Sequence, residues 1–180
     1  MNMLAIAFKE WAAVCGALAA GRQTVILRKG GIAEAGDEFT PEHPEFLLYP
    51  TFFHEHRVGV KPEFAALFDA AEQSRPATGT IRFTHLVRVA KVQRVTNIDD
   101  ALALDRFHVW TPDVVKQRFH YRTPGLFALT VRVFALPEPQ ARPERPEYAG
   151  CKTWVELAEP VPTAGATPGL TDDEFTRGTP

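Results

Sequence analysis

The chain has 180 residues, of which 45% are hydrophobic and 23% charged, and its formal net charge is −2. This length and composition are typical of one folded domain with its own core, and they exclude a mainly disordered or fibrous protein. A net charge near zero also excludes a strong overall field, so any attraction to nucleic acid has to come from local charge.

The first predicted element is a helix over residues 3–20, because apolar side chains recur there at spacings of three and four. Lys9 and Glu10 interrupt this apolar run, which is too short to span a bilayer, so we expect no membrane partner. Cys15 and Cys151 lie far apart in the sequence. This pattern excludes a disulfide framework and indicates a reducing, cytoplasmic location.

A strand is predicted over residues 23–28, which are apolar enough for the middle of a sheet. Glycines, prolines and acids make residues 29–45 a solvated loop, and residues 46–49 form a short strand after it. Residues 61–63, with the sequence Lys-Pro-Glu, open a second helix. Proline favours the first turn of a helix, and an acid there faces the positive end of the helix dipole.

Residues 80–95 are predicted to form one long strand, because apolar and polar side chains alternate there with a period of two as far as Val89. Val92 and Val95 fall out of this phase. Such a shift indicates a bulge or a sharp bend of the kind found in small barrels.

The last predicted elements are two short helices and two strands. Asn97 and Thr111 are typical residues at the start of a helix. The strands cover residues 126–135 and 151–157, with a proline-rich loop between them. Residues 158–180 are acidic, rich in proline, threonine and glycine, and lack an apolar period, so we expect a disordered tail.

Strands and helices do not alternate regularly in this order, which excludes a doubly wound parallel sheet. We therefore expect an α+β fold. It would be a curved, mainly antiparallel sheet of about five strands or a small half-open barrel, with peripheral helices. Residues 3–157 would form this single globular domain.

A basic run with glycines at the end of the predicted strand 23–28 is the best candidate for a binding site. It consists of Arg28, Lys29, Gly30 and Gly31. The arginine fork, the lysine charge and the free backbone N–H groups of flexible glycines suit a phosphate or a carboxylate. The run is neither a phosphate-binding P-loop nor a dinucleotide fingerprint. The alternative interpretation is a turn with solvated charges.

Two hydroxyl side chains, Tyr49 and Thr51, lie in an aromatic segment and would come near Arg28 if the two strands paired. An aromatic turn beside cations could stack a nucleobase, but core packing explains the same residues.

The segment His54-Glu55-His56 offers two histidines that share one face of an extended chain, as in a metal-binding pair. A catalytic zinc needs three protein ligands, and spacing does not choose a third among the other histidines, so we expect no bound metal or cofactor. We expect either a hydrogen-bonded position at a cleft for His54 or a surface pair of His54 and His56. A metal-assisted hydrolase or nuclease that uses this segment is the enzymatic alternative.

Residues 79–135 carry nine basic side chains against four acidic ones. Within them, residues 106–122 interleave cations, aromatics and histidines. Trp110 and Tyr121 could stack on bases while Arg118 and Arg122 contact phosphates. The alternative is that the aromatic residues of this run pack in the core under helices.

Several of these segments resemble a known family, the bacterial domain of unknown function 1802. The resemblance covers about residues 3–157 and rests on residues 7–12, 26–32 and 46–51, on His54 and Glu55, and on residues 124–126. The family is uncharacterised, and some members lie beside restriction-endonuclease-like domains. The resemblance therefore implies, by association, a role in nucleic-acid metabolism, DNA restriction or defence, and it supplies no catalytic residues.

The preferred architecture is a small barrel that resembles PUA-like domains, which read modified bases. The leading hypothesis is a module that binds nucleic acid or another phosphate-bearing ligand. Its expected site residues are Arg28, Lys29, Gly30, Gly31, Tyr49, Thr51, His54, Arg82 and Arg118. The alternatives are the metal-assisted hydrolase and a non-catalytic scaffold for protein interactions.

Overall fold

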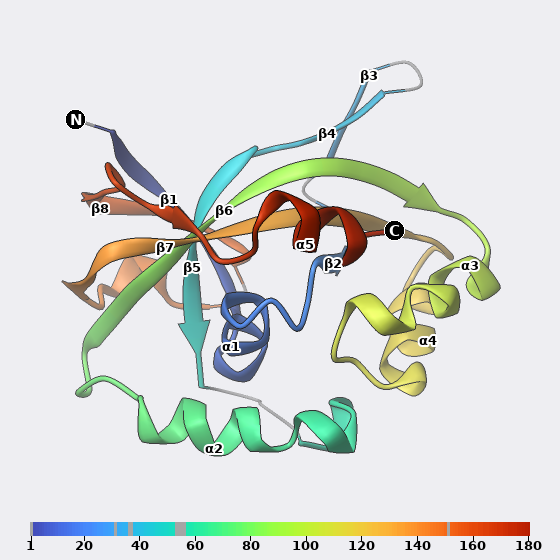
Figure 1. Cartoon of the computed structure of the whole chain (residues 1–180), viewed down its shortest axis with the longest axis horizontal. Coiled ribbons are helices and arrows are strands. Elements are labelled where there is room, and N and C mark those ends of the chain that lie inside the picture. Colours follow the sequence, from blue (N-terminus) through green and yellow to red (C-terminus); the bar gives the residue numbers. More distant parts are fainter. Residues whose placement is uncertain (1, 31, 36–37, 53–56, 151) are drawn as a thin grey trace.

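A curved sheet of seven strands forms the centre of the molecule (Figure 1). The computed structural model describes residues 2–30, 32–35, 38–52, 57–150 and 152–180. The sheet consists of β1 (Met3–Trp11), β2 (Val25–Arg28), β5 (Glu45–Thr51), β6 (Thr80–Val95), β7 (Leu126–Pro143), β8 (Trp154–Pro162) and β9 (Thr167–Pro168). The strand order is β2-β7-β6-β5-β1-β8, and β9 pairs with β7.

Among the described strands of this sheet, β1 and β5 pair in parallel and the other pairs are antiparallel. The predicted α+β class with a curved, mainly antiparallel sheet is therefore confirmed. A separate hairpin of β3 (Ile32–Ala35) and β4 (Glu38–Pro41) occupies part of the segment expected to be a loop.

Helices lie around the sheet (Figure 1). They are α1 (Ala12–Ala19), α2 (Ala66–Gln73), α3 (Ile98–Ala103), α4 (Pro112–His120) and α5 (Asp172–Arg177), with short 3-10 turns at Arg57–Gly59, Pro62–Phe64, Asp105–Phe107 and Pro146–Tyr148. The predicted start signals are confirmed. The Asn97 side chain accepts a hydrogen bond from the Asp99 N–H, and Pro112 occupies the first turn of α4.

The predicted N-terminal helix is wrong over its first half, because residues 3–11 form β1 and only α1 is helical. β1 lies between β5 and β8 in the sheet. The neighbouring residues Ala7 and Phe8 are both 0% exposed, so β1 is buried on both faces. A strand that is buried on both faces shows no alternation, and its continuous apolar pattern can match a helical one.

The long strand over residues 80–95 is confirmed, and its pairing with β7 shifts register in two places. One shift follows Val89, close to where the sequence pattern changes phase. The other lies between Phe83 and His85, opposite residues 135–140 of β7. Two prolines of β7, Pro137 and Pro139, fall within this irregular stretch. A proline cannot donate a hydrogen bond to a neighbouring strand, and in this irregular stretch the pairing with β6 does not require one. β7 therefore continues through the segment expected to be a loop.

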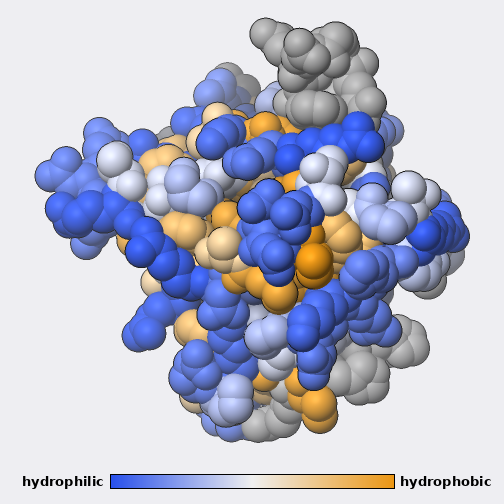
Figure 2. Space-filling view, turned by 90° about the vertical axis from the view of Figure 1, so that its right-hand side faces the viewer, coloured by the Kyte–Doolittle hydropathy of each residue, from blue (hydrophilic) through white to orange (hydrophobic). Residues whose placement is uncertain are grey.

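The sheet has a hydrophobic cluster on each face. The first contains Phe8, Phe46 and Leu129 together with residues of α1 and α4, and the second contains Leu47, Leu86 and their neighbours. The outer side of α3 and α4 is largely hydrophilic, with hydrophobic residues visible near the middle of the view (Figure 2). No helix among the described residues is long and apolar enough to cross a membrane.

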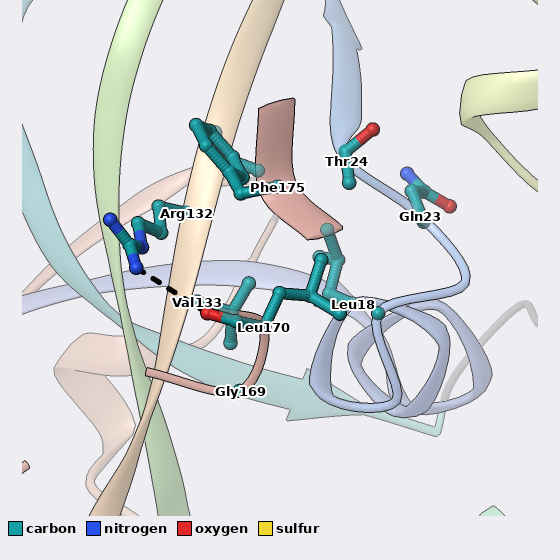
Figure 3. A pocket seen from close by; sticks show the side chains of 10 residues that line it. Leu18, Gln23, Thr24, Arg132, Val133, Gly169, Leu170 and Phe175 are labelled. Carbon is teal, nitrogen blue, oxygen red and sulfur yellow. Dashed lines mark hydrogen bonds between the residues drawn. The ribbon is translucent and has the colours of Figure 1, made fainter. Parts of the chain in front are cut away.

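The expectation of a disordered tail differs from the structure, in which residues 158–180 contain the end of β8, β9 and α5. The Gly169 N–H donates to the Val133 carbonyl oxygen, and the Thr24 hydroxyl donates to the Gly178 carbonyl oxygen. Leu170 and Phe175 reach toward the sheet and α1 (Figure 3). The first of these hydrogen bonds joins residues 36 positions apart in the sequence and the second joins residues 154 positions apart, so the local composition of the tail does not reveal them.

Candidate functional site

β2 ends at Arg28, and this side chain reaches the segment that directly precedes β8. Its Nη2 donates to the Thr153 hydroxyl oxygen at 2.7 Å, and its guanidinium lies 4.8 Å from the centroid of the Phe8 ring. Thr153 directly precedes β8, the edge strand opposite β2. Arg28 therefore joins the two edges of the sheet.

A second arginine, Arg118 of α4, lies beside it. Its Nη1 is 3.5 Å from the carbonyl oxygen of Leu27, and its guanidinium is 4.0 Å from the Trp110 ring centroid. Burial lowers the pKa of both arginines, the Arg118 charge lowers the pKa of Arg28 further, and Glu10 opposes these effects at both. Both side chains are half-buried, and we call Arg28 and Arg118 the half-buried arginine pair. Two residues of the expected site are thus together, with Glu10 as their acidic neighbour.

Lys29 points instead to the turn after α4. Its Nζ donates to the carbonyl oxygens of Phe119, Thr123 and Gly125 at 2.5 to 2.9 Å. A lysine ammonium has three N–H donors, so these acceptors use all of them. A cation at the carbonyl end of a helix is also favoured by the helix dipole. Lys29 therefore holds the turn in place and contributes charge, without a donor left for a ligand.

A pocket of about 280 Å³ lies next to this lysine. It is lined by the turn over residues 121–125, by the first two residues of β7, by Lys29, and by Arg94 near the end of β6. Lys29, Arg94 and Arg122 are cations, and none of the described lining residues is acidic. We call it the basic pocket. Arg94 and Arg122 are both exposed, as is neighbouring Gly30, where an added Cβ would meet open space.

The turn at the rim of the basic pocket carries an aromatic ring and a cation. Tyr121 is 57% exposed, and the Arg122 guanidinium lies 5.2 Å from its ring centroid. Trp110 and Phe119 of the same basic and aromatic run are 1% and 3% exposed. The core interpretation is therefore correct for these two rings, and Tyr121 is the ring that reaches solvent.

The remaining expected site residues do not join either cluster. Tyr49 is buried on the opposite face of the sheet, and its hydroxyl lies 3.4 Å from Glu144 Oε1; burial and that carboxylate raise its pKa. The Thr51 hydroxyl donates to the Glu10 carbonyl oxygen at 3.1 Å.

Arg82 lies far from the basic pocket. It is exposed and pairs with Ala141, whereas Arg94 pairs with Phe127. Roughly 40 Å of strand separate these two arginines.

Two expected site residues, Gly31 and His54, lie outside the described residues, as does the rest of the His54-Glu55-His56 segment. No three His, Cys, Asp or Glu side chains in the described part of the chain come together as metal ligands. His108, one possible third ligand, is buried in the core, where its Nδ1 accepts a hydrogen bond from the Trp110 N–H. Metal binding by the His54-Glu55-His56 segment thus stays a hypothesis.

Tyr121 and Arg122 belong to the basic and aromatic run in the sequence, but they are not among the residues of the expected site. Arg94 carried no signal beyond the local excess of basic residues. Its place beside Lys29 follows from the pairing of β6 with β7, which brings Arg94 opposite Phe127.

Comparisons with known proteins agree with this fold. The ASCH protein of Zymomonas mobilis superimposes with a TM-score of 0.50, at 12% identity, over 96% of this chain and 91% of that chain. A serine-to-alanine mutant of it gives a TM-score of 0.50, at 10% identity, over 96% and 92%. ASCH domains have a PUA-like fold, so the predicted architecture is confirmed. None of the curated proteins matches the sequence.

The model of one protein family, described as a domain of unknown function (DUF1802), matches residues 7–179. This range includes most of the tail that the sequence analysis had placed outside the domain. The match spans nearly the whole chain, and the chain therefore belongs to the DUF1802 family.

Proposed function

We propose that this protein is a nucleic-acid-binding module and that its phosphate contacts lie in the basic pocket. The observation that carries this proposal is a pocket of about 280 Å³ lined by Lys29, Arg94 and Arg122, with no acid among its described lining residues. Exposed guanidinium groups bind phosphate oxygens through two parallel hydrogen bonds. The PUA-like fold is consistent with the proposal.

The three cations of the basic pocket have different roles in this proposal, because their contacts differ. Lys29 is fully engaged with carbonyl oxygens, so it supplies positive charge and a fixed turn. Arg122 and Arg94 are exposed, and they supply the donors for phosphate. The half-buried arginine pair makes its hydrogen bonds to Thr153 and Leu27 of the protein itself, so we assign it a structural role. A link to DNA restriction or defence is a further proposal that rests on the family resemblance alone.

Fluorescence anisotropy with labelled DNA and RNA at about 50 and 200 mM salt tests the proposal. Two phosphate contacts predict an affinity that falls roughly seven- to twelvefold between these salt concentrations. The double variant Arg94→Ala with Arg122→Ala should lose most of the affinity and most of the salt dependence.

The matched control is Arg75→Ala with Arg82→Ala. It removes the same charge from two exposed residues, Arg75 just after α2 and Arg82 at the start of β6. Arg82 lies far along β6 from Arg94. We expect this variant to bind like the unchanged protein. Equal losses in both double variants would show that only net charge matters, and binding retained without Arg94 and Arg122 would refute the assignment of the pocket.

A further inference from the structure

The turn that carries Tyr121 has a backbone conformation that its sequence does not favour. Tyr121 has φ −62° and ψ 120°, and Arg122 has φ 59°. These angles match the two central positions of a type II turn, where the second position normally requires glycine or asparagine. Arg122 is the single non-glycine residue with positive φ in the described part of the chain. An arginine there is strained, and such strain is found most often at ligand-binding sites.

The strained turn is held firmly in place. Lys29 binds the carbonyl oxygens of Phe119, Thr123 and Gly125, which lie before and after the turn, and the Gly125 N–H donates to the Phe119 carbonyl oxygen. The result is an aromatic ring that is 57% exposed on an anchored support, with a guanidinium beside it. Fixed exposed rings of this kind serve as stacking platforms for bases.

The size of the basic pocket limits what can occupy it. A volume of about 280 Å³ is near the lower end for small-molecule sites, which is the scale of one nucleotide. Its inner wall includes the buried Leu126 and the half-buried Phe127, both apolar. A base stacked within a duplex has no free face to offer to Tyr121, whereas an unpaired base has one.

We infer that the basic pocket binds an unpaired nucleotide of a single-stranded nucleic acid, whose base stacks on Tyr121 while its phosphate contacts Arg94 and Arg122. This inference rests on the proposed function, because it names the ligand class of the same pocket. The strained conformation of Arg122 places the phosphate-binding fork next to the stacking ring. Glycine at this position would relax the turn but would remove the fork.

The first test compares ligands on the unchanged protein. Anisotropy is measured with a single-stranded oligonucleotide and with a duplex of the same length, in DNA and in RNA. Calorimetry compares adenosine monophosphate with ribose 5-phosphate, which carries the phosphate and no base. We expect single strands to bind at least about tenfold more tightly than duplexes, and adenosine monophosphate to bind more tightly than ribose 5-phosphate by a similar factor.

The second test changes the turn. Tyr121→Ala should weaken single-strand binding by roughly five- to 150-fold and remove the preference over duplexes, while Tyr121→Phe keeps the ring and should bind like the unchanged protein. Arg122→Gly should raise the thermal midpoint of unfolding by relaxing the turn and still lose affinity, which a purely structural role for Arg122 would not produce.

The outcomes separate this inference from the proposed function. Equal binding of single strands and duplexes, unchanged by Tyr121→Ala but lost on removal of Arg94 and Arg122, would overturn the stacking inference and leave the nucleic-acid module standing. The absence of binding to every nucleic acid at low salt would overturn both. Single-strand preference that is lost in Tyr121→Ala and kept in Tyr121→Phe would support both.

Discussion

The half-buried arginine pair and the basic pocket meet at the end of β2, where Arg28 belongs to the pair and Lys29 to the pocket, and their cations have different surroundings. Arg28 and Arg118 are covered by aromatic rings and hydrogen bond to Thr153 and Leu27 of the protein itself. Arg94 and Arg122 are exposed and line a pocket without described acids. The comparison teaches that clustered positive charge in a sequence marks two different roles, and that burial and partners separate them.

The largest expected effect concerns His108, which is buried in the core near Arg118. Burial lowers the pKa of His108 from its usual 6.5 to about 4, with Lys61 and Arg118 adding to the shift and Asp105 opposing it. A lowered pKa means that the folded protein binds the proton less readily than the unfolded chain does. The contribution of neutral His108 to the free energy of unfolding is therefore fully present above about pH 6.5. It is lost as the pH falls toward 4, by up to about 3 kcal/mol.

Urea unfolding between pH 7 and pH 4 measures this loss, with His108→Gln as the comparison. The variant should show a flatter dependence of unfolding free energy on pH. Burial also lowers the pKa of His85, which contributes a slope of the same sign, so the two proteins are compared by the difference between their slopes. Identical slopes would mean that His108 does not titrate differently in the folded and unfolded states.

The next largest effect is expected for Glu10→Gln, which removes the acidic neighbour of the half-buried arginine pair and keeps the shape of the side chain. Its Oε1 accepts a hydrogen bond from the Trp11 N–H, and an amide oxygen can replace it there. Leaving the two guanidinium groups without this carboxylate should cost about 2 to 3 kcal/mol of unfolding free energy. Nucleic-acid affinity per folded molecule should not change, and a drop in affinity without loss of stability would move the pair into the binding site.

Lys29→Met connects the two regions, because it keeps the length of the side chain and removes its charge and donors. Three carbonyl oxygens at the end of α4 and in the turn lose their partner, at a cost of about 1 to 2 kcal/mol. Amide hydrogen exchange should accelerate in residues 119–125, and single-strand affinity should fall with it. Weaker binding with unchanged exchange in these residues would mean that Lys29 contacts the ligand directly.

Local signals were sufficient for much of the fold. The helix starts at Asn97 and Pro112 depend on their own side chains and immediate neighbours, and both are in place. The alternation from residue 80 to Val89 likewise indicated β6, which continues past the change of phase to Val95. β1 was missed because a strand with two buried faces has no alternation to read. α5 was missed although Thr171 and Glu174 form a capping box, a local start signal, because the tail lacks an apolar period and its packing partners lie far away in the sequence.

The site was predicted in region but not in detail, for a related reason. The basic run at Arg28 and Lys29 does lie beside the pocket, yet the acceptors that occupy these side chains come from positions 90 to 125 residues away along the chain. A sequence shows where cations gather. It does not show which carbonyl and hydroxyl groups the fold will bring to them, and that decides which cations are available to a ligand.

Tyr49 gives the smallest effect and the sharpest contrast with the basic pocket. Its hydroxyl was expected near Arg28, but the ring is buried on the other face of the sheet and the hydroxyl meets Glu144 at the long distance of 3.4 Å. Tyr49→Phe keeps the ring and its edge contact with Phe83. It should change the unfolding free energy by about 0.5 kcal/mol, because a single weak hydrogen bond is lost. Nucleic-acid affinity should stay the same, since the change lies across the sheet from Tyr121 and Arg122. If Tyr49→Phe weakened single-strand binding as Tyr121→Ala is expected to, the ligand would have to lie against the second cluster, and the basic pocket would lose its assigned role.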